Sequence, residues 1–279
     1  MIDKRNIKEI LEFGHMETDQ GARKPMSLRV LRPVKRSRKS EGARLCDDLM
    51  SLQRGGYWDD GKGGWLEPRL VAEGREEEMG YVRKHQVYIR VPREMCWRET
   101  GRAPVKTGWA DTNKGTAEHP NVRCRWVAKE FNTGPRPDLF APTSPLEGVK
   151  LVVSQAASSG KSDTVILIID VRRAYFYAKT TRRVFIELPM EDYQPGDEGK
   201  CGLLQQSLYG TRDAAANWEK ELSGFLHSLG FTQGQASLCL HRSERLGACA
   251  AVHGDDVTIA AGRKEACLLY TSDAADEGL

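Results

Sequence analysis

The pattern of apolar and polar positions changes near residue 81. Before it, charged and glycine-rich stretches follow one another without a clear period, as in QRGGYWDDGKGGW (53–65), and such composition is typical of chain that buries little apolar surface. Residues 86–92 and 122–131 then alternate as strands do. We therefore expect a poorly ordered, basic and glycine-rich segment over residues 1–80 and an ordered domain over 81–266.

Two helices and a buried strand are predicted inside that domain. Ser144, Pro145 and Glu147 form a helix start, with a capping box and a proline at the first helical position, ahead of an apolar stripe. The run DTVILIID (163–170) is continuously apolar, which is typical of a strand buried on both faces. Residues 211–231 place Trp218 and several leucines on one helical face.

Further strands are predicted over residues 182–189 and 201–210, and a hairpin over 247–262. The order is strand, helix, strand, strand, helix and hairpin. This interleaving predicts an α+β fold with a split sheet rather than a doubly wound one.

Composition narrows the class of protein. With 279 residues, 39% of them hydrophobic, the chain can form one large domain or two small ones. It lacks a run as apolar as a membrane span or a signal peptide, so a cytoplasmic or nuclear protein that is not secreted is expected. The seven cysteines are odd in number and form no C-x-x-C pair, which argues against a disulfide framework and a zinc module.

The charge distribution leaves two interpretations open. The net charge is only +3, but residues 29–39 (RVLRPVKRSRK) hold six basic residues and no acid. Such a run is typical of nucleic-acid-binding arms and equally of disordered linkers.

Three aspartates carry the chemistry. Asp170 ends the predicted buried strand, while Asp255 and Asp256 occupy the tip of the hairpin. Taken alone, the tip is an ordinary Gly-Asp turn with a solvated neighbour. If the strands are neighbours, however, three carboxylates converge. Like charges repel, so such a cluster is favourable only when divalent cations lie between the carboxylates. Carboxylates and substrate phosphates around two cations form the two-metal arrangement for phosphoryl transfer.

Several blocks in this order resemble the reverse transcriptase of copia-type LTR retrotransposons. They are ILIIDVRRAYFYAKTTRRVFIELPMED (166–192), QQSLYGTRDAAANWEKELSGFLHSLGF (205–231) and VHGDDV (252–257). VKTGWADTNKG (105–115) and VRCRWVAKEF (122–131) resemble the fingers of the same family. The resemblance spans about two thirds of the chain, and it implies fingers and a partial palm over residues 81–266, with the thumb absent.

The resemblance also implies an activity. It is RNA-directed DNA synthesis, the two-metal transfer of deoxynucleoside triphosphates onto a primer 3′-hydroxyl. An RNA template, a DNA or RNA primer and two Mg²⁺ ions, with Mn²⁺ as a substitute, are the implied partners and cofactors. Asp170, Asp255 and Asp256 match the catalytic, metal-binding aspartates, with Asp256 in the less direct role.

Six further residues match substrate-binding positions of the family. Tyr175 would stack under the incoming sugar and exclude a 2′-hydroxyl, although aromatic residues more often serve in packing. Arg123, Arg125 and Lys129 would hold the triphosphate or template, or would protect an exposed edge strand. Tyr209 and Gly210 belong to the SLYG turn, which lies against the nucleotide and template in the family. The six are Arg123, Arg125, Lys129, Tyr175, Tyr209 and Gly210.

Two departures from the family qualify this expectation. His253 replaces the usual aromatic residue before the aspartate pair. The family continues into a thumb and an RNase H domain, whereas CLLYTSDAADE (267–277) resembles a translated sequencing adapter, so residues 267–279 are expected to be an adapter-derived tail. The chain is then expected to be weak or inactive as a polymerase.

Two alternative functions stay open. One is a non-catalytic remnant that at most binds nucleic acid, and the other is an RNA-dependent RNA polymerase, which Tyr175 disfavours.

Overall fold

The computed structural model describes residues 11–16, 56–131, 134, 146–160 and 163–271. The chain divides into two compact units. Unit 1 combines residues 1–18, 130–184 and 204–279, and unit 2 combines residues 19–129 and 185–203. Both units contain helices and β-sheet, so the predicted α+β class is confirmed. The finer assignment to fingers and palm stays a prediction.

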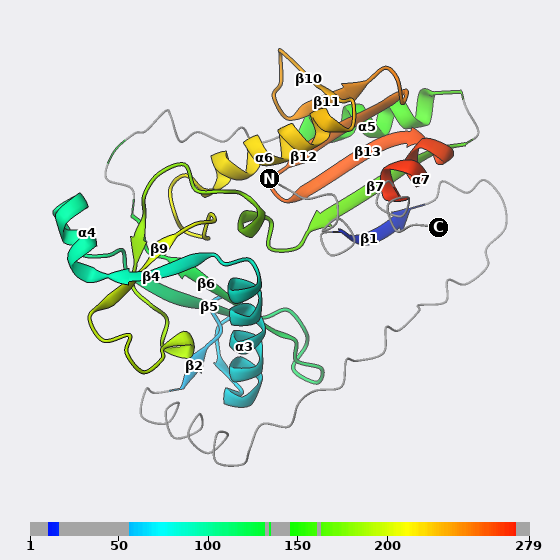
Figure 1. Cartoon of the computed structure of the whole chain (residues 1–279). Coiled ribbons are helices and arrows are strands. Elements are labelled where there is room, and N and C mark those ends of the chain that lie inside the picture. The colour runs from blue at the N-terminus through cyan, green and yellow to red at the C-terminus, as the bar shows by residue number, and fades with distance from the viewer. Residues whose placement is uncertain (1–10, 17–55, 132–133, 135–145, 161–162, 272–279) are drawn as a thin grey trace, which may run out of the picture. The chain divides into compact units, whose positions relative to one another are not determined.

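Unit 1 is built on a six-stranded antiparallel sheet (Figure 1). The strand order is β1-β7-β13-β12-β11-β10, so β7 lies between β13 and β1. The strand predicted over residues 163–170 and the predicted hairpin are therefore neighbours, but the strand is not buried on both faces as expected, since Ile168 is 38% exposed. The strands are β1 (Leu11–Met16), β7 (Thr164–Val171), β10 (Thr232–Gln233), β11 (Leu240–Ser243), β12 (Ala248–His253) and β13 (Asp256–Gly262).

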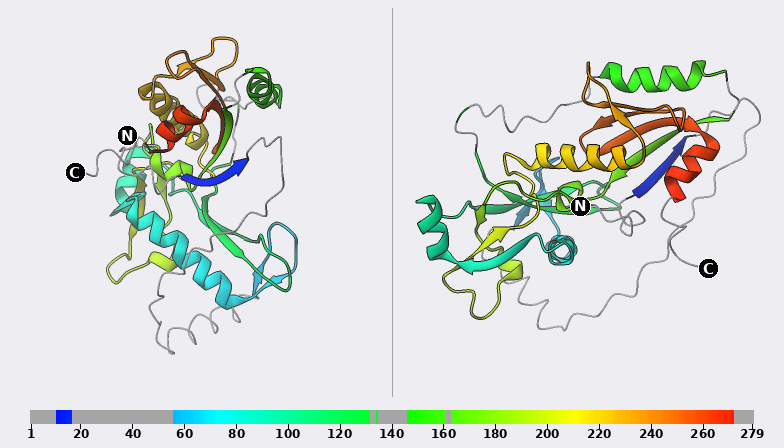
Figure 2. Two further views of the ribbon diagram at one scale, coloured as in Figure 1. Left: turned by 90° about the vertical axis from the view of Figure 1, so that its right-hand side faces the viewer. Right: turned by 45° about the horizontal axis from the view of Figure 1, so that its top comes forward.

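Helices cover both faces of this sheet (Figure 2). On one face, Val152 of α5 (Leu146–Ser158) packs against Cys249, Ala251 and Ala260. The strands' alternate residues form the larger core on the other face, with the apolar stripe of α6 (Ala214–Ser228). A third helix, α7 (Arg263–Thr271), follows β13. No helix in the described part of the chain combines the length and apolar character needed to cross a membrane.

In the residues that the structure describes, unit 2 combines a long helix with three small sheets. Helix α3 (Pro68–Lys84) starts with a proline at its first turn and packs Val71 against Cys124 of β6. The sheets are β2–β3, β5–β6 and β4-β9-β8. Their elements are β2 (Tyr57–Trp58), β3 (Trp65–Leu66), β4 (Tyr88–Pro92), α4 (Arg93–Thr100), β5 (Thr107–Asn113), β6 (Val122–Ala128), β8 (Phe185–Ile186) and β9 (Lys200–Leu204).

Two sequence-based boundaries differ from the elements seen here. Residues 56–80, which we expected to be poorly ordered, form β2, β3 and most of α3, because buried side chains such as Asp59 and Val71 hold this segment together. The expected tail beginning at residue 267 would start inside α7. The predicted helix start at Ser144 and Pro145 lies outside the described residues, as do residues 272–279.

Candidate active site

Asp170 and Asp256 lie directly opposite each other on adjacent antiparallel strands. Asp256 is the first residue of β13, and its register partner on β7 is Asp170. Residues opposite each other in a sheet present their side chains to the same face. That face is the one on which α5 packs, since Ala260 lies on the same side of β13. The fold thus brings two of the three predicted aspartates together.

The third aspartate, Asp255, lies in the two-residue turn between β12 and β13. Gly254 precedes it with a φ of 65°, and glycine at the first turn position is typical of tight hairpins. The backbone N–H of Val171 donates to the carbonyl oxygen of Asp255 at 3.0 Å. The indole Nε1–H of Trp218 donates to the carbonyl oxygen of Gly254 at 2.8 Å. The turn is therefore fixed from two sides, by β7 and by α6.

The three carboxylates interact electrostatically at this edge of the sheet. Partial desolvation raises the pKa of Asp256, and repulsion by Asp255 and Asp170 raises it further, while His253 works in the opposite direction. Clustered carboxylate oxygens of this kind suit a hard divalent cation. Among the residues that the structure describes, however, no group of three or more His, Cys, Asp or Glu side chains could hold a metal ion unaided. A cation here would complete its coordination with oxygen atoms of water or of a substrate.

Two predicted aromatic residues meet beyond the end of β7. Tyr175 lies in a short 3-10 helix, η3 (Ala174–Tyr177), and its ring centroid is 4.8 Å from that of Tyr209. Arg173, which directly precedes η3, has a φ of 54°, a left-handed conformation that costs a residue with a side chain about 1 kcal/mol. Gly210 has a φ of 81° in the turn after Tyr209. The contact between the rings suits a packing role for Tyr175 equally well.

An ion-pair network that sequence reasoning missed supports the Tyr209 turn. Arg182 donates to Glu130 at 2.7 Å and to the buried Asp213 at 2.7 Å. The backbone N–H of Arg212 donates to Glu130 at 2.9 Å. Burial opposes ionisation of Glu130, but these two donors outweigh it and lower its pKa. The network therefore ties the chain just after Tyr209 to the segment around Arg182.

Two of the predicted basic residues, Arg123 and Arg125, lie on one side of β6 in unit 2, and Lys129 follows directly after the strand. Cys124 and Trp126 are buried on the other side, so alternation turns Arg123 and Arg125 the opposite way. Arg123 and Lys129 are exposed and Arg125 is half-buried. Since β6 pairs only with β5 in its sheet, this arrangement suits both phosphate binding and the protection of an edge strand.

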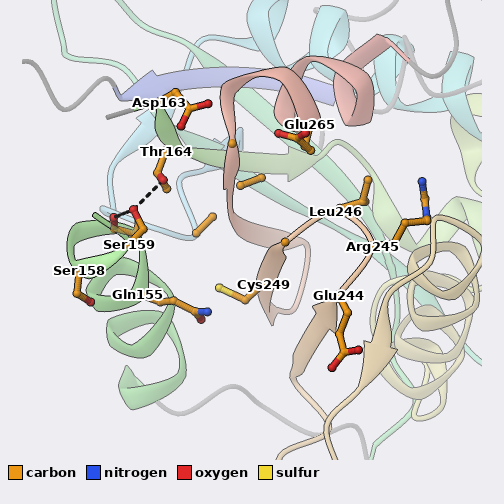
Figure 3. Close-up of a pocket in the computed structure, with 15 residues that line it drawn as sticks. Gln155, Ser158, Ser159, Asp163, Thr164, Glu244, Arg245, Leu246, Cys249 and Glu265 are labelled. Atoms are coloured by element: carbon orange, nitrogen blue, oxygen red, sulfur yellow. Dashed lines mark hydrogen bonds between the residues drawn. The ribbon is translucent and has the colours of Figure 1, made fainter. Parts of the chain in front are cut away.

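A cavity of about 600 Å³ lies at the other end of the unit 1 sheet (Figure 3). Its lining includes Asp163 and Thr164 at the start of β7, Gly262 at the end of β13, and Glu265 of α7. In Figure 3 a hydrogen bond of 2.8 Å joins Ser159 and Thr164. The predicted site residues take no part in lining this cavity.

Comparison with known proteins identifies the class. Residues 95–267, more than half of the chain, match the family described as "Reverse transcriptase (RNA-dependent DNA polymerase)". The chain belongs to this family. It is also 22% identical over 182 residues to the "Retrovirus-related Pol polyprotein from transposon TNT 1-94" of Nicotiana tabacum, a match covering 63% of this chain and 13% of that polyprotein. The resemblance to copia-type reverse transcriptases is thereby confirmed.

The sequence predicts that Trp218 packs in the core, but it does not predict the hydrogen bond from Trp218 to the hairpin turn. The helical stripe predicted its burial, and its exposed fraction is 2%. The bond from its indole N–H to Gly254 was not predicted, although buried tryptophans usually find a partner for this group. That general requirement is the signal that could have directed attention to the turn.

Proposed function

We propose that the chain is an RNA-directed DNA polymerase that adds deoxynucleotides to a primer 3′-hydroxyl on an RNA template. The observation that carries this proposal is the register pair of Asp170 and Asp256, with Asp255 in the adjoining turn. All three lie inside the residues that match the reverse transcriptase family. The polyprotein relative is named as retrovirus-related, which agrees with synthesis from RNA.

Asp170 and Asp255 would be the principal ligands of two Mg²⁺ ions, with Asp256 beside them. When bound, such ions lower the pKa of an attacking hydroxyl and stabilise the departing pyrophosphate. Phosphate oxygens of the nucleotide would supply further ligands. The protein's contribution is to hold the carboxylates in place, which the bonds from Val171 and Trp218 to the hairpin turn support.

Tyr175 would select the sugar. Its ring packs against Tyr209 and is followed by the buried Phe176, so it has little freedom to move aside. A ring fixed beneath the sugar of a bound nucleotide would clash with a 2′-hydroxyl and admit deoxynucleotides. Gly210, next to Tyr209, would leave room for the template or nucleotide backbone.

Arg123, Arg125 and Lys129 would bind phosphate groups of the nucleotide or the template. Arginine suits phosphate because its planar guanidinium can donate two parallel hydrogen bonds. The shared orientation of Arg123 and Arg125 on β6, with the exposed Lys129 just after the strand, supports a common polyanionic ligand.

The test is single-nucleotide incorporation on a primed RNA template, with dTTP opposite adenine and Mg²⁺ or Mn²⁺. The assay measures the addition of a single nucleotide, because this step does not require processive synthesis. The wild-type chain should add this single nucleotide, but weakly, and Asp255→Asn should add it about a hundredfold more slowly still. Equal rates would refute the aspartate assignment. Binding of primed RNA without any extension would favour the non-catalytic alternative.

A further inference from the structure

The β2–β3 hairpin of unit 2 presents two tryptophans to solvent. Trp58 and Trp65 are cross-strand partners with exposed fractions of 53% and 71%. Their ring centroids are 5.3 Å apart and their planes nearly perpendicular, at 86°. On the other face of the hairpin, Leu66 is buried and Tyr57 stacks with Arg75. We propose that the outward tryptophan pair is a stacking platform for the bases of a single-stranded nucleic acid.

The hairpin is held rigidly, which a stacking platform requires. Asp59 is buried, and its carboxylate accepts the backbone N–H groups of Gly61, Lys62 and Asn113 at 2.8, 3.1 and 3.2 Å. The Asp60 carboxylate accepts the backbone N–H of Asp111 at 3.0 Å. The carboxylates of Asp59 and Asp60 thus accept hydrogen bonds that fix the hairpin to β5. The platform is ordered before any ligand arrives, so binding loses little conformational entropy.

A glycine, Gly56, lies close to the indole ring of Trp65. Gly56 has a φ of 84°, and a Cβ atom there would lie 3.0 Å from Cε3 of Trp65. A larger residue would be strained and would displace the indole. The glycine-rich sequence around the tryptophans is therefore part of how the rings are presented.

Three basic residues, Lys62, Lys114 and Arg123, lie near the tip of this hairpin, which also carries the exposed Asp60. The ammonium group of Lys62 donates to the carbonyl oxygen of Gly115 at 2.7 Å, beside the exposed Lys114. Gly61 approaches Thr112, whose cross-strand partner is the exposed Arg123. Aromatic faces beside such charges are the combination that binds single strands, through base stacking and phosphate contacts. Glu67, exposed directly after β3, would oppose a polyanion.

This surface goes beyond the proposed polymerase site. Trp58 and Trp65 lie upstream of residues 95–267, which match the reverse transcriptase family. Stacking on the platform needs neither a metal ion nor a nucleotide. Its test can therefore succeed or fail independently of polymerase activity.

The test measures binding of fluorescein-labelled dT12 and rU12 to the full chain by anisotropy, in EDTA and without nucleotides. Trp58→Ala and Trp65→Ala should each weaken binding about tenfold. Trp→Phe at either position should retain an intermediate affinity because a ring face remains. Glu67→Gln should strengthen binding, and Lys62→Ala should weaken it and flatten its salt dependence.

Trp97→Ala is the matched control, because Trp97 is 52% exposed on α4 in the same unit. It should bind as the wild type does, and circular dichroism should show that all variants are folded. Equal oligonucleotide affinity in the wild type and in the Trp58→Ala/Trp65→Ala variant would overturn the proposal. So would a double variant that binds normally but loses self-association in sedimentation, which would make the surface a protein contact. If the alanine variants unfold, the phenylalanine and Lys62 variants decide the question alone.

Discussion

The indole N–H of Trp218 in α6 donates to the carbonyl oxygen of Gly254 in the turn between β12 and β13, at 2.8 Å. Its ring is buried against the core formed by the sheet. One residue therefore couples the packing of α6 to the position of the turn that carries Asp255. A helix that would otherwise only cover the sheet thus takes part in shaping the candidate site.

Trp218→Phe should separate these two roles, since phenylalanine keeps an aromatic ring in the core but lacks the N–H. We expect the free energy of unfolding to fall by about 1–3 kcal/mol, from the lost hydrogen bond and the smaller ring. Nucleotide incorporation should fall more than this loss of folded protein explains. Chemical denaturation and incorporation rates measure the two effects. Trp97→Phe on α4 is the control, and an unchanged rate in Trp218→Phe would show that the bond does not position the turn.

Tyr175→Val should relax sugar selection. Without the ring, ribonucleotides should be incorporated more readily relative to deoxynucleotides, by about tenfold or more, because the steric clash with the 2′-hydroxyl is gone. Tyr175→Phe keeps the ring and should keep the selectivity. Competing UTP and dTTP on the primed RNA template provide the measurement. A Tyr175→Val variant that loses stability but not selectivity would show that the residue only packs.

Glu130→Gln should lower stability in a way that depends on pH. Folding lowers the pKa of Glu130, so its ionised form stabilises the native state above the carboxyl's ordinary pKa. This contribution is lost as the pH falls through the lowered native value. The variant should therefore be about 2 kcal/mol less stable than the wild type at pH 7. The difference should shrink progressively below about pH 4, as measured by denaturation at each pH. A difference that stays constant down to pH 3 would refute the ion-pair explanation.

Arg75→Ala should strongly destabilise unit 2. The Arg75 guanidinium donates to Asp111 at 2.6 Å and to Glu191 at 2.7 Å, and it stacks against Tyr57 and Trp109. Because Asp111 is buried, its carboxylate would be left without its partner, at a cost of about 3–5 kcal/mol.

Arg69→Ala on the same helix is the control for this prediction. Its guanidinium is 66% exposed and pairs with Glu73 at 3.3 Å. An exposed pair of this kind contributes about 0–1 kcal/mol. Thermal unfolding of both variants makes the comparison, and equal shifts in Tm would contradict the stabilising role assigned to Arg75.

The elements that the sequence predicts well are those with a strong local pattern. The apolar run before Asp170 became β7, and the stripe around Trp218 became α6. The pairing of Asp170 with Asp256 could be expected only if the two strands were neighbours, which the blocks resembling reverse transcriptases made plausible. The position of each aspartate in its strand was therefore predictable, but their shared register was not.

Structure that depends on distant polar partners escaped prediction. The hairpin around Trp58 has the composition of a linker, and Asp59 holds it through backbone N–H groups, one of them at Asn113. The bonds from Arg182 to Glu130 and Asp213 join residues far apart in sequence. Neither arrangement leaves a periodic trace, because hydrogen-bonding partners are set by the tertiary fold.

The most direct test of the account compares Asp170→Asn with Asp163→Asn in single-nucleotide incorporation on primed RNA. Asp163 directly precedes β7 and Asp170 lies near the end of the strand, but only Asp170 faces Asp256. Asp170→Asn removes a repulsive neighbour of Asp256, so the protein should be at least as stable as the wild type. Its incorporation rate should nevertheless fall about a hundredfold or more, while Asp163→Asn stays near the wild-type rate. Full activity in a folded Asp170→Asn variant would contradict the proposed active site.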